Sequence, residues 1–125
     1  MNAPANLKYT KSDEWFDPET GKMGLTDYAQ DQLSDIVFVE MLVDVDDDTE
    51  TGSPIASVES VKASAETYAS ASGKVVAVNE DLADNPEVLN SDPYGEGWMV
   101  QIEGGEPGEV MDAAAYEKYC QEREH

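Results

Sequence analysis

The amino-acid sequence predicts a mainly β fold, a sandwich or barrel that carries short helices and ends in a helix. Short segments rich in β-branched and other apolar residues recur along the chain, a pattern typical of sandwiches and barrels. Clusters of Gly, Pro, Asn and Asp separate these segments and favour turns. With 125 residues the chain is long enough for one ordinary domain and too short for two. We therefore expect a single domain over 1–125, with an ordered core at roughly 7–121.

The first segments are expected to form short strands. Residues 7–10 and 14–16 are predicted as strands, and residues 22–25 return as a third. The segment Asp17-Pro18-Glu19-Thr20-Gly21 favours a hairpin turn, because Pro fixes one backbone dihedral and Gly permits another.

A short helix and the strongest strand prediction follow. Thr26 or Asp27 can cap a helix that runs to about Leu33, since apolar residues recur there at helical spacing. Residues 36–42 are apolar almost throughout and rich in β-branched residues, which predicts a strand.

The middle of the chain is predicted as an acidic loop followed by paired strands. Residues 44–52 form the loop. Residues 54–60 and 63–69 are expected to be two strands around Val61-Lys62. A further strand is predicted at 74–78.

The last third is expected to contain a helical turn, a strand and the closing helix. Residues 84–87 include Pro and start the helical turn. Residues 98–102 form the late strand, and a helix runs from about 112 to 121.

The charge excludes several kinds of partner. Twenty-eight acidic residues face seven basic ones, and the net charge is −21. Binding to nucleic acid or to an anionic membrane requires Lys and Arg, so we expect neither partner. Repulsion among so many carboxylates opposes compaction in dilute buffer. Because concentrated salt shortens the range of this repulsion, we expect the protein to come from a halophile.

Few residues are available for an enzyme active site. The chain has one cysteine, Cys120, and one histidine, His125 at the end. These supply neither a nucleophile–base pair nor a zinc site. The acidic loop resembles a calcium loop but has Thr49 where the turn needs Gly and Ile55 where a Glu should close the site. We expect no catalytic residues and no metal. Because the sequence shows no signal peptide and no membrane span, we expect a cytoplasmic protein.

Lys62 is the residue that best supports a function. It lies among small and apolar residues at the centre of the predicted hairpin, where its amine would be accessible to a modifying enzyme. Acylation there would remove the charge and attach a long arm. From spacing alone, an ordinary surface lysine that discourages strand pairing is the more common explanation.

The sequence around Lys62 resembles the lipoyl-attachment motif of glycine cleavage system H proteins. The motif reads Glu59-Ser60-Val61-Lys62-Ala63, and biotinyl domains usually have methionines beside their lysine instead. Further stretches resemble the same family in the right order along nearly the whole chain: Lys8-Tyr9-Thr10 with Glu14-Trp15, residues 24–30, residues 35–40 and residues 90–98.

This resemblance implies a lipoyl/biotinyl-like β-sandwich, also called a barrel-sandwich hybrid, with lipoate attached to Lys62 through an amide. It implies a non-catalytic carrier that shuttles the aminomethyl group and reducing equivalents from glycine decarboxylation. The implied partners are a pyridoxal-phosphate glycine decarboxylase, a tetrahydrofolate-dependent aminomethyltransferase, dihydrolipoyl dehydrogenase, and a lipoyl-attaching ligase or transferase. A carrier that visits several enzymes is most simply a monomer.

The resemblance also suggests two carboxylates that contact the loaded arm. Glu14 matches the family's position for such a contact, and Glu66 is the nearest match to a second acidic position, one methylene longer than the family's Asp. Asp13 stands where the family commonly has His. For both glutamates the alternative is plain surface acidity.

Two other classes of function stay open at this point. One is a related lipoyl protein, either a lipoate relay or a 2-oxoacid dehydrogenase domain, although the Glu14-Trp15 and 93–98 segments oppose the latter. The other is an unmodified β-sandwich that binds a partner. Intact mass would separate a lipoylated carrier from such a module.

Overall fold

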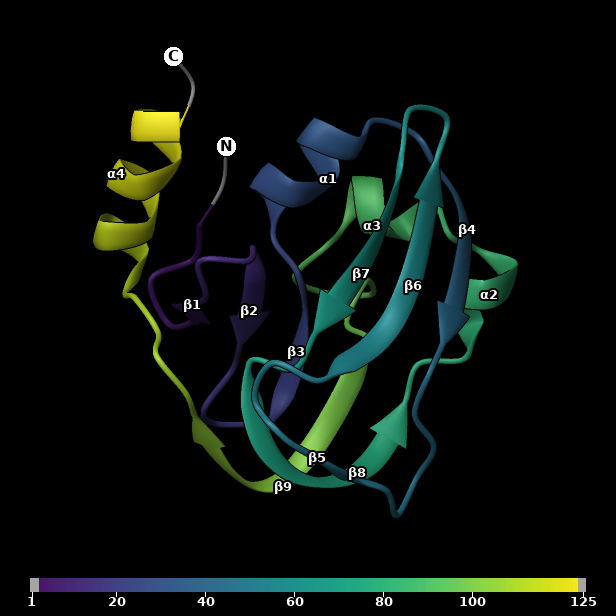
Figure 1. The fold of residues 1–125 in the computed structure, drawn as a ribbon, viewed down its shortest axis with the longest axis vertical. Coiled ribbons are helices and arrows are strands. Elements are labelled where there is room, and N and C mark those ends of the chain that lie inside the picture. The colour runs from purple at the N-terminus through teal and green to yellow at the C-terminus, as the bar shows by residue number, and fades with distance from the viewer. Residues whose placement is uncertain (1–2, 124–125) are drawn as a thin grey trace.

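A computed structural model describes residues 3–123 and shows two β-sheets with short helices around them (Figure 1). The predicted mainly β fold with a C-terminal helix is confirmed. The elements in chain order are β1 (Lys8–Tyr9), β2 (Glu14–Phe16), β3 (Lys22–Leu25), α1 (Asp27–Leu33), β4 (Ile36–Met41), β5 (Asp48–Thr49), β6 (Pro54–Ser60), β7 (Ser64–Tyr68), β8 (Ala71–Val78), α2 (Asp81–Asp84), α3 (Val88–Ser91), β9 (Val100–Pro107) and α4 (Ala113–Arg123).

The two sheets differ in size and in shape. The larger has the strand order β1-β2-β3-β9-β8-β5, and the smaller has the order β4-β6-β7. The long strands β8 and β9 curl beneath the smaller sheet, and the β6–β7 hairpin extends away from them (Figure 1). Register shifts interrupt the β8–β9 ladder at two places, and such irregularities let a strand bend.

Two apolar clusters hold these layers together. The main core lies between the sheets and includes Ile55 and Val58 of β6 and Val75 of β8. A second cluster joins the N-terminal strands to α4, where Tyr9 and Tyr116 stack with ring centroids 4.7 Å apart. Helix α4 is therefore packed against the residues that precede and form β2.

Most predicted elements occur, with corrections at their ends. Thr26 caps α1 by accepting a hydrogen bond from the backbone of Ala29, as the sequence predicts. The acidic loop contains an unpredicted two-residue strand, β5, which pairs with β8. Strand β9 is longer than the predicted 98–102 and starts later, because it continues along β8 to Pro107.

The prediction around the 84–87 segment was incomplete. The structure has α2 before this segment and α3 after it. Asn85 has φ −132° and ψ 61°, outside the helical region. The residue before a proline is disfavoured in helical geometry, so Pro86 separates two short helices where the sequence analysis expected a single turn.

Candidate functional site

Lys62 lies at the exposed tip of the β6–β7 hairpin. The last ladder pair of the hairpin joins Glu59 to Ser64, and the four residues 60–63 form the turn. In Figure 1 this turn stands beyond the end of the sheet, close to the segment that connects α1 to β4. The predicted hairpin and the position of its lysine are as the sequence analysis expected.

The side chain of Ser60 organises this turn. Its hydroxyl oxygen accepts hydrogen bonds from the backbone amides of Lys62 (3.1 Å) and Ala63 (3.0 Å), and the hydroxyl donates to the carbonyl of Ala63 at 3.1 Å. The amide of Val61 donates to the carbonyl of Asp35 at 3.0 Å, which ties the tip to the chain entering β4. The backbone of Lys62 is thereby held in place.

The amine of Lys62 is held only loosely. Its Nζ donates to the carbonyl of Gln32 at 3.4 Å, near the end of α1, and the contact is exposed to solvent. Carbonyls in the last turn of a helix attract a cation weakly. A fixed backbone with a free amine is the geometry that attachment of a mobile arm requires.

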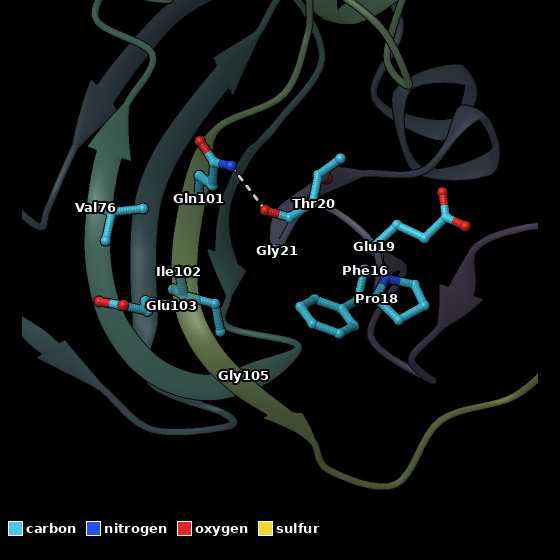
Figure 2. Close-up of a pocket in the computed structure, with 10 residues that line it drawn as sticks. All are labelled: Phe16, Pro18, Glu19, Thr20, Gly21, Val76, Gln101, Ile102, Glu103 and Gly105. Atoms are coloured by element: carbon cyan, nitrogen blue, oxygen red, sulfur yellow. Dashed lines mark hydrogen bonds between the residues drawn. The ribbon is translucent and has the colours of Figure 1, made fainter.

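One hollow of the described surface lies away from the hairpin tip. It has a volume of about 550 Å³ and lies between the β2–β3 turn and the strands β8 and β9 (Figure 2). In it, Gln101 donates a hydrogen bond to the carbonyl of Thr20, and Glu19 and Glu103 supply the carboxylates. Its described lining contains no Lys, Arg, His or Cys side chain.

Glu14 lies at the other end of the β7 strand and is almost completely buried, with an exposed fraction of 1%. Its Oε1 accepts hydrogen bonds from the hydroxyls of Thr10 (2.7 Å) and Ser12 (2.5 Å). Its Oε2 accepts one from the backbone amide of Tyr68 at 3.3 Å. Burial raises the pKa of Glu14 from 4.5 to about 7, because these hydrogen bonds only partly offset the lost hydration.

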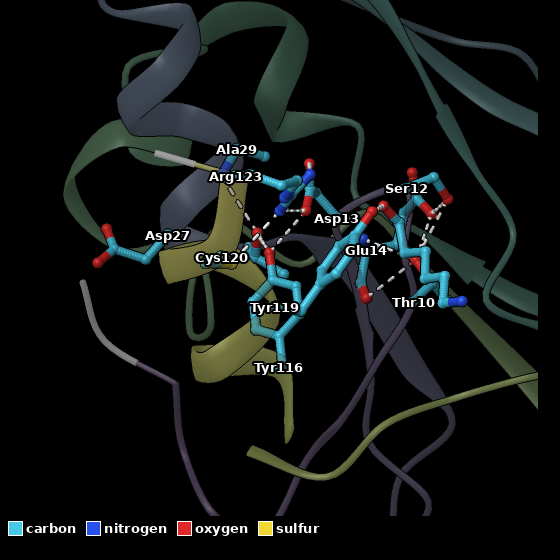
Figure 3. A network of polar contacts seen from close by, with 12 residues as sticks. Thr10, Ser12, Asp13, Glu14, Asp27, Ala29, Tyr116, Tyr119, Cys120 and Arg123 are labelled. Carbon is cyan, nitrogen blue, oxygen red and sulfur yellow. Dashed lines mark hydrogen bonds and ion pairs between the residues drawn. The ribbon is translucent and has the colours of Figure 1, made fainter. Parts of the chain in front are cut away.

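The turn before Glu14 is fixed by helix α4 (Figure 3). Asp13 has φ +73°, a conformation uncommon for residues other than Gly, Asn and Asp. Its carboxylate forms an ion pair with Arg123, with a shortest distance of 2.6 Å, and accepts a hydrogen bond from the hydroxyl of Tyr116 at 2.9 Å. The hydroxyl of Tyr119 donates to the carbonyl of Lys11 at 3.1 Å. Asp13, which stands where the H-protein sequences that this chain resembles commonly have His, therefore contacts α4.

A groove of about 380 Å³ adjoins the Glu14 end of the molecule. Its lining includes Thr10 and Ser12, which hold the carboxylate, and the charged residues Lys11 and Glu109, together with Thr51, Gly52 and Ala69. Apolar atoms supply most of its surface. Glu14 is not among the lining residues, so Thr10 and Ser12 are the side chains that connect the groove to the buried carboxylate.

Glu66 is exposed on β7, opposite Ser57 of β6. It lies between Lys62 at the tip and Tyr68, whose amide meets Glu14. Tyr68 is six positions after Lys62 in the chain, a distance of up to about 20 Å at 3.3 Å per residue. The structure does not bring the three predicted residues together: Lys62 lies in the turn before β7, Glu66 lies on β7, and Glu14 lies on β2 and meets the last residue of β7.

Comparison with known proteins identifies the family. The model of the family described as "Glycine cleavage H-protein" matches residues 7–123. The chain belongs to this family.

Relatives cover almost the entire chain. The glycine cleavage system H protein of Deinococcus deserti is 49% identical over 94% of this chain and 97% of its own length. That of Klebsiella pneumoniae is 48% identical, over 93% of this chain and 94% of its own length. The crystal structure of the H protein from Mycobacterium marinum superposes with a TM-score of 0.85, at 32% identity, and covers 92% of this chain and 96% of that one.

Family membership decides the class of function. The protein is a lipoyl carrier of the glycine cleavage system and a non-catalytic component of it, and H proteins carry their lipoate covalently on a lysine. No helix within residues 3–123 is long and apolar enough to span a membrane. In the same residues, no group of three or more His, Cys, Asp and Glu side chains is arranged to hold a metal ion.

The sequence analysis missed the residues that support Glu14. The hydroxyls of Thr10 and Ser12 precede it by four and two residues, and a search for polar residues close to Glu14 could have found them. Tyr68 is 54 residues from Glu14, and Arg123 is 110 residues from Asp13. No local pattern could have indicated either of these contacts.

Proposed function

We propose that Lys62 is the lysine that carries lipoate. The observation that carries the proposal is the combination of a backbone fixed by Ser60 and an amine whose single described contact is a 3.4 Å hydrogen bond to a carbonyl. The tip can therefore enter another protein without unfolding the hairpin. Once bound, lipoate supplies the disulfide chemistry that accepts the aminomethyl group and electrons.

We propose that Glu14 receives the amine at the far end of the arm, in the groove beside Thr10 and Ser12. A protonated amine is stabilised by a hydrogen-bonded carboxylate, and exclusion of water would slow its loss by hydrolysis. Because the pKa of Glu14 is near neutrality, an arriving ammonium would favour the ionised form. Glu66, exposed between the tip and the groove, is proposed as a second carboxylate along the path.

We further propose the setting in which this carrier works. Its partners are the glycine decarboxylase, the aminomethyltransferase, dihydrolipoyl dehydrogenase and a lipoyl-attaching enzyme. Membership of the H-protein family supports an association with the other components of the glycine cleavage system. The chain acts in the cytoplasm as one domain and as a monomer. Its net charge of −21 supports partners with basic docking patches and a halophilic source.

The lysine is tested by intact mass after incubation with lipoate, ATP and a purified lipoate–protein ligase. We expect one lipoyl increment, mapped to Lys62 by peptide analysis, and none in Lys62→Arg. Lys74→Arg is the matched control, because Lys74 is also exposed and lies on β8, away from the hairpin. A lipoyl increment on Lys62→Arg would contradict the proposal.

The carboxylates are tested by the lifetime of the aminomethyl-loaded protein in buffer. Glu14→Gln is expected to shorten the lifetime several-fold, and Glu66→Gln to shorten it less. Glu103→Gln, exposed on β9, is the control and should leave the lifetime unchanged. An unchanged lifetime in Glu14→Gln would remove Glu14 from the site.

A further inference from the structure

Three exposed apolar side chains lie on the turn that holds Lys62 and on β4, the strand that is hydrogen-bonded to this turn. Val37 and Phe38 of β4 are 54% and 47% exposed, and Val61 in the turn is 68% exposed. The Val61 amide donates to the carbonyl of Asp35, so the turn is joined to the start of β4. We call Val37, Phe38 and Val61 the tip patch.

A β-bulge creates the tip patch. Ile36 is opposite Ser60, but the next ladder pair joins Phe38 to Glu59, so β4 uses one more residue than β6. In a regular strand Phe38 would share the inward face of Ile36. The extra residue turns Phe38 to the outer face instead, and Val39 returns to the core opposite Val58.

The bulge therefore exchanges one inward apolar side chain for another. Val39 is buried in the core, and the larger Phe38 is left 47% exposed on the outer face. Single exposed apolar residues are common on proteins, and Val45 and Val76 are such residues here. The tip patch differs from them because its three apolar side chains lie on the Lys62 turn and on the strand bonded to that turn.

The surroundings of the tip patch are acidic. Asp35 lies just before β4, Glu40 follows Phe38 and Val39 on that strand, and Glu59 is paired with Phe38. All three are exposed, and no ion pair is described for them within residues 3–123. A complementary protein would therefore present an apolar centre with Lys or Arg at its edge.

The short side chain of lysine indicates which kind of enzyme must contact the tip patch. An enzyme that acylates Nζ must bring its reacting atoms to the end of a four-carbon stem, so its surface must cover the residues beside that stem. Enzymes that act on the finished cofactor meet it at the far end of the added arm and need not touch these residues.

We propose that the tip patch is the docking surface for the lipoate–protein ligase that modifies Lys62, and that the ligase contacts it through an apolar pocket with a basic edge. This inference rests on the proposed function of Lys62. It goes beyond that function by assigning Val37, Phe38 and Val61 to recognition by one partner.

The test compares lipoylation rates of threonine variants, because threonine keeps the β-branched shape and strand preference. The triple variant Val37→Thr, Phe38→Thr and Val61→Thr is expected to lose about tenfold or more in kcat/KM, mainly through KM, since it removes apolar area from the interface. The control variants Val45→Thr and Val76→Thr change exposed valines elsewhere and should react at the unaltered rate.

Two further measurements identify the partner. The triple variant, fully lipoylated by prolonged incubation, should be reduced by the glycine decarboxylase system and reoxidised by dihydrolipoyl dehydrogenase at unaltered rates. Asp35→Asn with Glu40→Gln should weaken the salt dependence of lipoylation. Val61→Thr alone changes only an exposed turn residue, so it keeps the test valid if the triple variant is unstable.

The outcomes separate the inference from the proposed function. An unaltered lipoylation rate in the folded variants would overturn the inference, as would an equal loss in the reactions of the lipoylated protein. Lipoylation of Lys62→Arg would overturn the proposed function instead. If lipoylation still requires Lys62 but proceeds at the unaltered rate in the tip-patch variants, only the inference is overturned and the proposed function stands.

Discussion

The two ends of strand β7 are built in opposite ways. At the tip, Ser60 fixes the turn through hydrogen bonds to residues two and three positions later, and the charged amine of Lys62 is exposed. At the other end, Glu14 is buried, and the turn before it is held by α4. Arg123 of this helix contacts Asp13, which is 110 residues earlier in the chain. An attachment point must be reachable by other proteins, whereas a site that shelters an amine must exclude water. The first requirement is met by local sequence and the second by tertiary packing.

The largest expected difference between the two ends is in their response to pH. Glu14 has a pKa of about 7 in the folded protein against an ordinary value of 4.5, so the folded state binds more protons than the unfolded chain between these values. The contribution of Glu14 to the free energy of unfolding therefore falls by about 3 kcal/mol as the pH rises from 4.5 to 7. Above pH 7 this contribution stays constant. Denaturant unfolding at a series of pH values should show this slope, superimposed on the effect of the other carboxylates.

Glu14→Gln is the variant that isolates the contribution of this carboxyl. It should flatten the fall between pH 4.5 and 7 relative to the unaltered protein, whatever its absolute stability. Glu66→Gln changes an exposed glutamate on the same region of the molecule and serves as the control. If both variants keep the same slope as the unaltered protein, the Glu14 end is more hydrated than its burial indicates.

The contrast also explains what the sequence could predict. Residues 59–63 carry the hairpin tip within five consecutive positions, so Lys62 and its turn were accessible to local reasoning. Glu14 was found only through resemblance, because its hydrogen-bond partner Tyr68 comes from a distant strand. The bulge at Val37 could not be predicted either, since residues 36–39 are all apolar and do not indicate which side chains face the core.

A smaller effect is expected from the hydroxyl of Tyr116, which joins α4 to the Glu14 turn. It lies 2.7 Å from the hydroxyl of Thr26 and donates to Asp13. Tyr116→Phe removes both of these hydrogen bonds from a largely buried cluster and should cost about 1–2 kcal/mol of unfolding free energy. Tyr119→Phe, which removes an exposed hydrogen bond to Lys11, should cost less. Equal losses in the two variants would mean that α4 is held by its apolar contacts alone.

The ion pair between Asp13 and Arg123 should contribute less again. The two side chains are 19% and 28% exposed, and partly solvated pairs contribute on the order of 1 kcal/mol or less. A double-mutant cycle with Asp13→Asn and Arg123→Gln measures the coupling directly. The coupling should decrease in concentrated salt. A coupling of zero at low salt would show that Tyr116 and Tyr119 suffice to hold the turn.

The smallest effect on stability is expected at the tip. Ser60→Ala removes the acceptor of the Lys62 and Ala63 amides, but water can replace it because the turn is exposed, so the unfolding free energy should change by less than about 0.5 kcal/mol. Hydrogen exchange at those two amides should nevertheless become faster, and Ser60→Thr, which keeps a hydroxyl, should restore protection. Unchanged exchange in Ser60→Ala would mean that strand pairing alone orders the lysine. The tip would then be shaped by the same long-range packing as the Glu14 end, and the contrast between the two would be lost.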